Sequence, residues 1–173
     1  MNYSANNFFK FCPHCGSRYQ QSQKKGVLEC RKCGFYFYQN SKPTVSVFLE
    51  DDHGRILLVK RAIKPKKGWW DSPGGFLKDG EEPLTGLSRE IKEELNIALK
   101  NVRLFGIYMD TYRHGYDLNT LNLVYLAKRK AGALKPLDDV NKLRWFAARH
   151  IPWRRIGFPW LVSALKDWIK SRN

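Results

Sequence analysis

The stretch GFLKDGEEPLTGLSREIKEELNI, residues 75–97, decides the fold of this chain. Glu90, Glu93 and Glu94 stand within five positions of one another in it, although the chain as a whole is basic. Its 173 residues include 31 Lys and Arg against 16 Asp and Glu, for a formal net charge of +15. Like charges three and four residues apart destabilise a helix by roughly 0.2–0.5 kcal/mol per pair. Negative charge this concentrated therefore needs an explanation.

Apolar residues recur in the same stretch at the spacing of one helix face. The stripe consists of Leu84, Leu87, Ile91 and Leu95. Pro83 suits the first turn of a helix because its missing N–H would have no partner there. The pattern predicts a helix that begins near Pro83 and ends at Ile97, with the three glutamates on the face opposite the leucines.

The glutamates have two interpretations. They are either a solvated charged face, partly neutralised by Arg89 and Lys92, or ligands for a cation. Gly74 and Gly75, just before the helix, allow a sharp turn and close backbone approach to a ligand. Carboxylates beside an exposed backbone carbonyl form the hard-oxygen environment that Mg2+ or Mn2+ prefers.

The stretch resembles the signature of the Nudix hydrolases. From Gly75 it runs G-x5-E-x7-R-E-U-x-E-E-x-N-U, where U is aliphatic, and the family pattern differs at one specified position, where it has Gly and this chain has Asn96. Asn is the next-best residue for a left-handed helix cap, so this departure is minor. The resemblance extends to GWWDSPGGF before the stretch and to LRWFAARHIP near residue 150.

The resemblance implies an α/β fold, a Nudix α/β/α sandwich with a mixed sheet. It also implies hydrolysis of a nucleoside diphosphate linked to another moiety, with Mg2+ or Mn2+ as the catalytic cofactor. Arg89 would orient the glutamates, and Gly75 and Glu81 would be supporting residues. The ligands implied for the ion are the Gly74 carbonyl, Glu90, Glu93 and Glu94. One of these three glutamates could instead be the general base.

Further site residues are expected outside the signature. Asp139 stands where the family often has a Glu ahead of a WF strand, and we expect it to be another metal ligand. Its rivals are Asp138, Asp110 and Asp117. The candidates for substrate contact are Arg61, Tyr112 and Arg113; surface or core packing is an equally good interpretation of the aromatic residues in this segment.

Four cysteines in two C-x2-C pairs predict a small metal site. Cys12 and Cys15 form one pair, Cys30 and Cys33 the other, with fourteen residues between the pairs. Two such turns complete the tetrahedral sulfur shell of a structural Zn2+. The alternatives are free buried thiols or two disulfides, and a reducing compartment disfavours the disulfides. We expect residues 1–40 to form a zinc ribbon and residues 41–173 the Nudix domain.

The remaining elements are predicted from local patterns. Residues 44–50 and 55–61 are strand-like runs around the turn DDHG, which predicts a hairpin. Further strands are expected at 102–112, 120–129 and 142–148. Residues 159–171 predict a closing amphipathic helix with Leu161, Leu165, Trp168 and Ile169 turned inward.

Composition limits the partners. No apolar run approaches the roughly 20 residues that cross a bilayer, and the N-terminus lacks the features of a signal peptide. We therefore expect a cytoplasmic protein without membrane contact. The positive charge is compatible with polyanions, although charge spread over many segments is more typical of a solvated surface than of a nucleic-acid site.

A four-cysteine ribbon ahead of a Nudix domain resembles the NADH pyrophosphatase group, although that group's motif after the signature is missing here. We expect a pyrophosphatase that acts on ADP-ribose, NAD(H) or a similar ADP-containing compound. The alternatives are a zinc-ribbon nucleic-acid-binding protein and an RNA-decapping Nudix enzyme. A homodimer is possible by analogy with the family.

Overall fold

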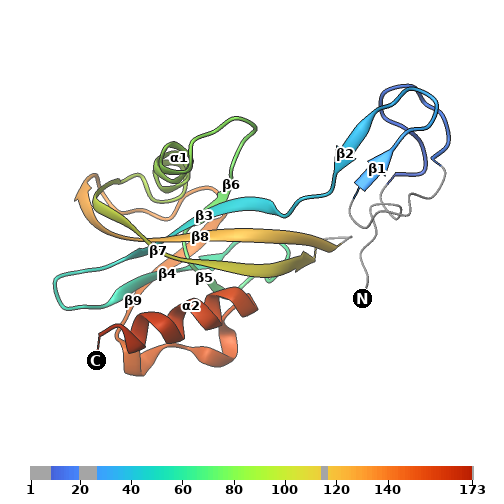
Figure 1. Ribbon diagram of the computed structural model, residues 1–173. Helices are drawn as coiled ribbons and strands as arrows, with labels where there is room; N and C mark the ends of the chain where they lie inside the picture. The colour runs from blue at the N-terminus through green and yellow to red at the C-terminus, as the bar shows by residue number, and fades with distance from the viewer. Residues whose placement is uncertain (1–8, 20–26, 114–116, 173) are drawn as a thin grey trace. The chain divides into compact units, whose positions relative to one another are not determined.

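A computed structural model describes residues 9–19, 27–113 and 117–172 of the chain (Figure 1). The chain divides into two compact units, Met1–Ser41 and Lys42–Asn173. Each unit is described by itself. Of the helices in the described ranges, none combines the length and apolar composition needed to cross a membrane.

The smaller unit is built from two turns and a short sheet. Strands β1 (Val27–Glu29) and β2 (Tyr36–Tyr38) pair antiparallel. Each Cys-x2-Cys turn ends in a glycine with positive φ, 69° at Gly16 and 71° at Gly34. The N–H of each glycine donates to the carbonyl of the first cysteine of its turn. Glycine allows this left-handed backbone without steric cost.

Four strands of the larger unit form a mixed sheet in the order β6-β3-β8-β7. They are β6 (Gly74–Phe76), β3 (Lys42–Leu49), β8 (Asp117–Ala131) and β7 (Ala98–Arg113). Strands β3 and β8 run parallel, and the other two pairs are antiparallel. The mixed sheet expected from the resemblance is therefore confirmed.

A second, three-stranded antiparallel sheet has the order β5-β4-β9. Its strands are β5 (Trp70–Asp71), β4 (Ile56–Arg61) and β9 (Val140–Phe146). The predicted hairpin between β3 and β4 is wrong, because the two strands enter different sheets and share only an isolated bridge between Glu50 and Ile56. The physical reason is that β8 pairs along the whole of β3 and β6 pairs with Thr44–Ser46, whereas β4 pairs with β5 and β9 and meets the end of β3 only at the Glu50–Ile56 bridge.

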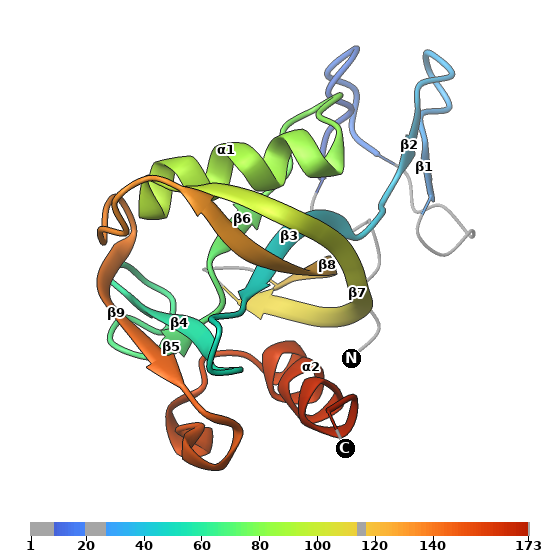
Figure 2. The ribbon, with the colours of Figure 1, turned by 90° about the vertical axis from the view of Figure 1, so that its left-hand side faces the viewer.

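Helices α1 (Pro83–Leu95) and α2 (Pro159–Lys170) lie on opposite sides of the strands (Figures 1 and 2). Helix α1 covers a core that includes Val45, Val47 and Leu57, and α2 covers a second core that includes Phe48, Ile56 and Leu58. Alternate residues of β3 and β4 thus face different helices, as the period of two in a strand requires. This arrangement is the predicted α/β/α sandwich. Two short 3-10 turns, η2 (Ala148–His150) and η3 (Trp153–Arg155), precede α2.

Helix α1 differs from the prediction in two details, its C-terminal end and the exposure of Leu84. The helix ends at Leu95, not at Ile97, because Asn96 adopts the left-handed conformation (φ 54°) and its N–H donates to the Lys92 carbonyl. Leu84 is 54% exposed and does not belong to the buried stripe. It lies in the first turn, next to an exposed loop, so that only the following apolar positions reach the core.

The predicted closing helix is confirmed. Leu161, Leu165 and Trp168 are buried in the core under α2, and Ile169 is half-buried against the same core. The helix also contacts the turn after β3, because Trp168 Nε1 and Arg172 Nη1 both donate to Glu50 Oε1, at 2.9 and 2.8 Å. These bonds fix α2 against the sheet that forms the floor of the site.

Candidate active site

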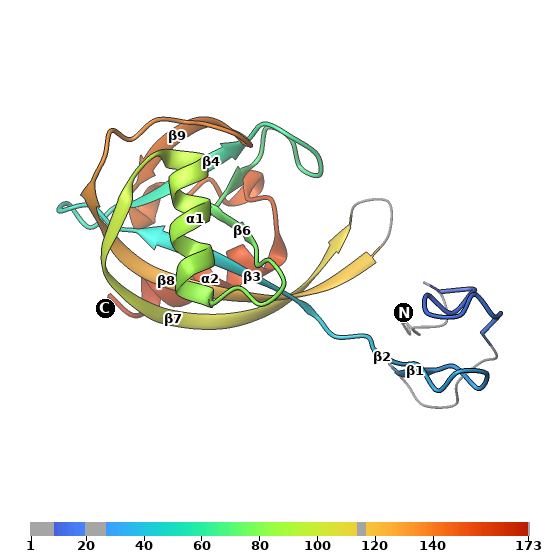
Figure 3. The same cartoon turned by 90° about the horizontal axis from the view of Figure 1, so that it is seen from above.

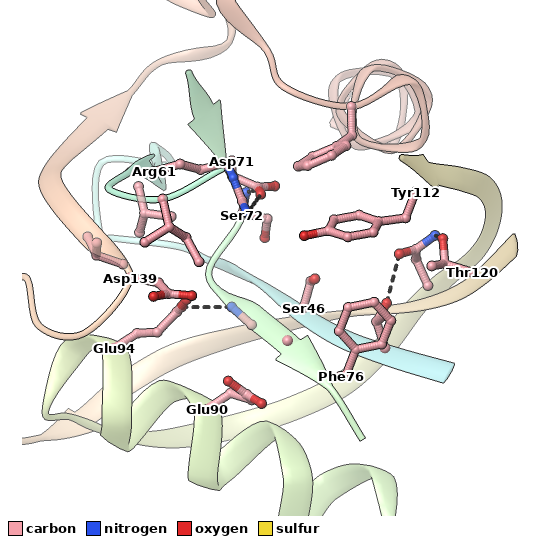
Figure 4. A pocket seen from close by; sticks show the side chains of 18 of the residues that line it. Ser46, Arg61, Asp71, Ser72, Phe76, Glu90, Glu94, Tyr112, Thr120 and Asp139 are labelled. Atoms are coloured by element: carbon pink, nitrogen blue, oxygen red, sulfur yellow. Dashed lines mark hydrogen bonds and ion pairs between the residues drawn. The ribbon is translucent and has the colours of Figure 1, made fainter. Parts of the chain in front are cut away.

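A pocket of about 340 Å3 lies within the larger unit, between the N-terminal part of β6, helix α1 and the ends of both sheets (Figure 4). It collects residues from segments far apart in the sequence. The predicted site residues that line it are Arg61, Gly74, Gly75, Arg89, Glu90, Glu94, Tyr112 and Asp139.

Glu94 is the most deeply buried carboxylate of the signature, with 8% of its surface exposed. Its Oε2 accepts a 2.9 Å hydrogen bond from the N–H of Gly74. Gly74 has φ 136°, and a side chain there would overlap the carbonyl of Val45, so only glycine allows this approach. Burial raises the pKa of Glu94 to about 8, and the charges of neighbouring carboxylates add to the effect.

Glu90 lies one turn earlier on α1 and faces the second glycine of the turn. A Cβ added at Gly75 would be 2.6 Å from the Glu90 carboxylate carbon, so glycine provides the space that this carboxylate occupies. Burial raises the pKa of Glu90, whereas the adjacent Arg89 guanidinium opposes the shift. The glycine pair therefore makes room for two partly desolvated carboxylates that line the same pocket (Figure 4).

Arg89 explains why the helix tolerates so many glutamates. Its Nε and Nη2 each donate to the Glu81 carboxylate at 2.7 Å, and its Nη1 donates to Glu90 at 2.7 Å and to Glu93 at 3.1 Å. The paired hydrogen bonds from Arg89 lower the pKa of Glu81 to about 2. Glu81 and Glu93 lie outside the pocket lining, and the Glu93 side chain is 46% exposed.

A partly buried ion pair that the sequence did not predict lines the pocket. Arg61 Nη1 donates to Asp71 Oδ2 at 2.9 Å, and the Ser72 N–H donates to Asp71 Oδ1 at 2.8 Å. Arg61 Nε also donates to the Pro65 carbonyl at 2.8 Å. The Asp71 carboxylate thereby fixes the arginine in the pocket wall. Asp71 could have been suspected from its place in WWDSPGG, whereas its partner is set by the pairing of β4 with β5.

The aspartates proposed as further ligands have different surroundings. Asp139 and Asp138 line the pocket in the turn before β9, and burial raises the pKa of Asp139. Asp110 also lines the pocket, but its Oδ2 accepts the N–H of Trp160, at the start of α2, at 3.2 Å. That bond caps a helix, which gives Asp110 a structural role. The side chain of Asp117 lies outside the described residues.

One wall of the pocket is aromatic. The Tyr112 ring lies edge-on to Phe76, with centroids 5.6 Å apart, and is stacked with Phe158 at 5.8 Å. The Arg61 guanidinium lies 5.2 Å from the centroid of Phe158. Phe76 and Phe158 were not predicted, because only the folded chain brings the end of β6 and the start of α2 to β7. Arg113, the third predicted substrate contact, is exposed and lies outside the pocket lining.

The floor of the pocket is a hydrogen-bonded polar layer on the mixed sheet. Thr44 Oγ1 donates to Asn122 Oδ1 at 2.7 Å, and Asn122 Nδ2 donates to the Tyr108 carbonyl at 3.0 Å and to Thr120 Oγ1 at 3.1 Å. These buried groups satisfy one another, which fixes the β3 and β8 side chains against the backbone of β7. Ser46 projects from the same floor toward the cavity (Figure 4).

The pocket carboxylates suit a hard divalent cation. In the described part of the chain, the only group of three or more acidic, cysteine or histidine side chains with ligand atoms all within 4.8 Å is the cysteine group. The carboxylates are thus spaced more widely than a closed all-protein cage requires. Mg2+ typically keeps several waters and uses one or two carboxylates together with substrate phosphates, and this open arrangement fits that habit.

The four predicted zinc ligands do converge. Cys12 and Cys33 Sγ are 3.8 Å apart, and Cys15 and Cys30 Sγ are 3.6 Å apart. Tetrahedral Zn2+ with Zn–S bonds of about 2.3 Å separates its sulfurs by about 3.8 Å. Disulfide sulfurs are about 2.05 Å apart, so the disulfide alternative does not describe this arrangement. The four sulfurs therefore have the spacing that the predicted zinc site requires.

Comparisons with known proteins agree with this geometry. The family model described as "NUDIX domain" matches residues 40–164. The chain is 28% identical over 144 residues to "NAD-capped RNA hydrolase NudC" of Vibrio atlanticus (strain LGP32), covering 83% of this chain and 51% of that protein. It is 36% identical over 141 residues to the protein of the same name from Haemophilus influenzae (strain PittGG), covering 80% and 51%. The chain thus spans about half the length of these curated relatives.

A solved structure is similar over almost the whole chain. "Crystal structure of NUDIX hydrolase from Nitrosomonas europaea" superposes with a TM-score of 0.73 and 29% sequence identity, covering 95% of this chain and 92% of that one. The matched family segment contains the glycine turn, the α1 carboxylates and the aromatic wall. The chain therefore belongs to the Nudix hydrolase family.

Proposed function

We propose that this chain is a divalent-metal-dependent pyrophosphatase that hydrolyses a nucleoside diphosphate linked to another group. The single observation that supports it best is the pair of partly desolvated α1 carboxylates, Glu90 and Glu94, facing the Gly74–Gly75 turn inside a pocket. Two buried like charges are costly by themselves, and a cation between them and a phosphate relieves that cost.

Glu90 and Glu94 are the residues we assign to hold Mg2+ or Mn2+, with the Gly74 carbonyl and Asp139 as further donors. Such an ion neutralises the diphosphate and activates water for attack. Arg89 positions Glu90 through a 2.7 Å bond and is itself fixed by Glu81. Glu93 reaches the same guanidinium from the exposed side of α1, which makes it a supporting residue in this proposal.

The other side of the pocket is assigned to the substrate. Arg61, fixed by Asp71, supplies positive charge for a phosphate group, and Lys78 lines the same cavity. The Tyr112 and Phe158 rings offer an apolar wall of the kind on which a nucleobase packs. This combination suits an ADP-containing substrate such as NAD(H) or ADP-ribose. The names of the curated relatives make NAD-linked compounds, free or at the end of an RNA, the first to test.

A substrate panel tests the proposal. Purified protein is incubated with NAD+, NADH, ADP-ribose or ATP and with Mg2+ or Mn2+, and released AMP is measured by chromatography. We expect AMP from at least one ADP-containing diphosphate, and loss of its release in Glu90→Gln. Glu82→Gln is the matched control, because Glu82 precedes the same helix outside the pocket lining. No turnover of any diphosphate with either ion would overturn the proposal.

A further inference from the structure

The loop between β4 and β5 carries an unusual concentration of positive charge. The loop follows the end of β4 (Figure 3). It contains Lys64, Lys66 and Lys67, all of which are exposed. Its base is closed by backbone bonds, from Gly68 N to the Arg61 carbonyl at 2.9 Å and from Arg61 N to the Trp69 carbonyl at 3.0 Å. The loop is therefore a defined part of the fold that presents its lysines to solvent.

A second basic segment packs against this loop. Turn η3 exposes Trp153, Arg154 and Arg155, with Trp153 39% exposed. The Trp69 ring joins the two segments, since Lys66 Nζ lies 4.5 Å and Arg155 Cζ 5.8 Å from its centroid. Two cations thus contact one indole, each within the range of a cation–π contact.

The cations of this surface are not neutralised locally. Throughout residues 9–19, 27–113 and 117–172, no ion pair joins a carboxylate to Lys64, Lys66, Lys67, Arg154 or Arg155. We call these five residues, together with Trp69 and Trp153, the basic patch. Cations without carboxylate partners, interleaved with aromatic rings, are the composition of surfaces that bind single-stranded nucleic acid.

The basic patch is continuous with the pocket. Arg61 lines the pocket, and its Nε holds the carbonyl of Pro65, between Lys64 and Lys66 in the patch loop. On the other segment, Gly157 N donates to the Trp70 carbonyl at 2.8 Å, and Phe158, next in sequence, lines the pocket. A polymeric ligand that extends out of the pocket past Arg61 and Phe158 therefore contacts the basic patch.

We propose that the basic patch binds the phosphodiester backbone of a single-stranded RNA whose terminal diphosphate occupies the pocket. This inference rests on the proposed function and names the substrate class for which the surface is built. The pocket itself is rich in carboxylates, which repel a polyanion without a bound cation. Positive charge outside the pocket is thus positioned to hold the RNA, while the indoles offer faces on which bases stack.

The test separates RNA binding from catalysis. A 3′-labelled, single-stranded RNA of about 12 nucleotides, within the site sizes of single-strand binders, is titrated with protein by fluorescence anisotropy at several NaCl concentrations. Hydrolysis of free NAD+ is measured in parallel. The patch variant is Lys67→Gln/Arg154→Gln, which leaves both cation–π partners of Trp69 intact. The matched control is Lys100→Gln/Arg129→Gln, which removes the same charge from β7 and β8 outside the pocket.

We expect the patch variant to bind the RNA about tenfold more weakly at low salt. The slope of the logarithm of the binding constant against the logarithm of the salt concentration becomes shallower by about 1.4 in this variant. Each phosphate contact with a single strand contributes about 0.7 to that slope, and the variant removes two cations. Trp153→Ala weakens binding by about fivefold through lost base stacking. Hydrolysis of free NAD+ stays at the wild-type rate in the patch, control and Trp153→Ala variants.

RNA affinity that is unchanged in the patch variant, or reduced equally in the control, would overturn the inference. Tighter binding of the wild-type protein to vesicles of anionic phospholipid than to RNA would also overturn it. Failure of the proposed function is distinguishable, because it appears as absence of hydrolysis by the wild-type protein, whatever the RNA affinity.

Discussion

Replacing Glu94 by Gln tests whether the buried carboxylate of α1 costs stability for the sake of function. Glu94 is nearly inaccessible and has its pKa raised to about 8 by burial, against an ordinary value of 4.5. Between these two values the folded protein keeps a proton that the unfolded chain has lost. The free energy of unfolding therefore falls as pH rises through this window.

The amide introduced by Glu94→Gln is uncharged at every pH and has almost the same shape as the carboxyl group. Its oxygen can still accept the Gly74 N–H. The free energy of unfolding of the Glu94→Gln protein therefore does not fall with pH in this window. One pKa unit corresponds to about 1.4 kcal/mol, so the variant gains about 3 kcal/mol over the wild type between about pH 5 and pH 7. It also loses hydrolytic activity, because Glu94 is one of the proposed ligands.

Urea unfolding in magnesium-free buffer measures this difference. The protein contains six tryptophans, all in the larger unit, so their fluorescence reports that unit and not the ribbon. The free energies of unfolding of wild type and Glu94→Gln are compared at intervals of about one pH unit across the window between the two pKa values. A stability difference that does not change with pH would refute the account of a desolvated carboxylate. Glu82→Gln, at a position outside the pocket lining, is the control and should show no such trend.

Four other perturbations have defined outcomes. Arg89→Met leaves the carboxylates of Glu81 and Glu90 without their partner and lowers the free energy of unfolding by about 3 kcal/mol, measured by urea denaturation; no loss would mean that the guanidinium is not their main support. Asp110→Ala removes the cap of α2 and lowers the free energy of unfolding by about 1 kcal/mol in the same assay. The Mn2+ affinity of this variant stays at the wild-type value, and a loss of Mn2+ binding would make Asp110 a ligand. Leu165→Ala empties a fully buried position under α2 and lowers stability by about 3 kcal/mol, and a loss below about 1 kcal/mol would contradict the described core. Removal of metal by a strong zinc chelator unfolds the cysteine unit and leaves the tryptophan fluorescence of the larger unit unchanged; circular dichroism unaffected by the chelator would argue against a structural zinc.

The signature segment was predictable because its information is local. The apolar period, Pro83 and Asn96 located α1, with errors at its C-terminal end and at Leu84, which is exposed. The bond from Arg89 to Glu93 follows from their spacing of four residues on one helix. The cysteine spacing likewise predicted a convergent sulfur set, since each pair lies within one tight turn.

The wrong or missing predictions concern contacts between segments that are distant in the sequence. The runs on either side of DDHG have the pattern of a hairpin, but β3 pairs along its length with β8, which comes much later in the chain, and β4 pairs with β5 and β9. The Arg61–Asp71 pair depends on the alignment of β4 with β5. The aromatic wall depends on α2 reaching β7. None of these pairings has a local pattern that specifies it.

The central claim is that Glu90 and Glu94 hold a divalent ion in the pocket. Titration of the zinc-loaded protein with Mn2+, followed by the electron paramagnetic resonance signal of free Mn2+, tests it most directly. The account predicts a Mn2+ site in the larger unit whose affinity falls more than about tenfold in Glu90→Gln and in Glu94→Gln, and is unchanged in Glu82→Gln. Equal Mn2+ affinity in the wild type and all of these variants would contradict it.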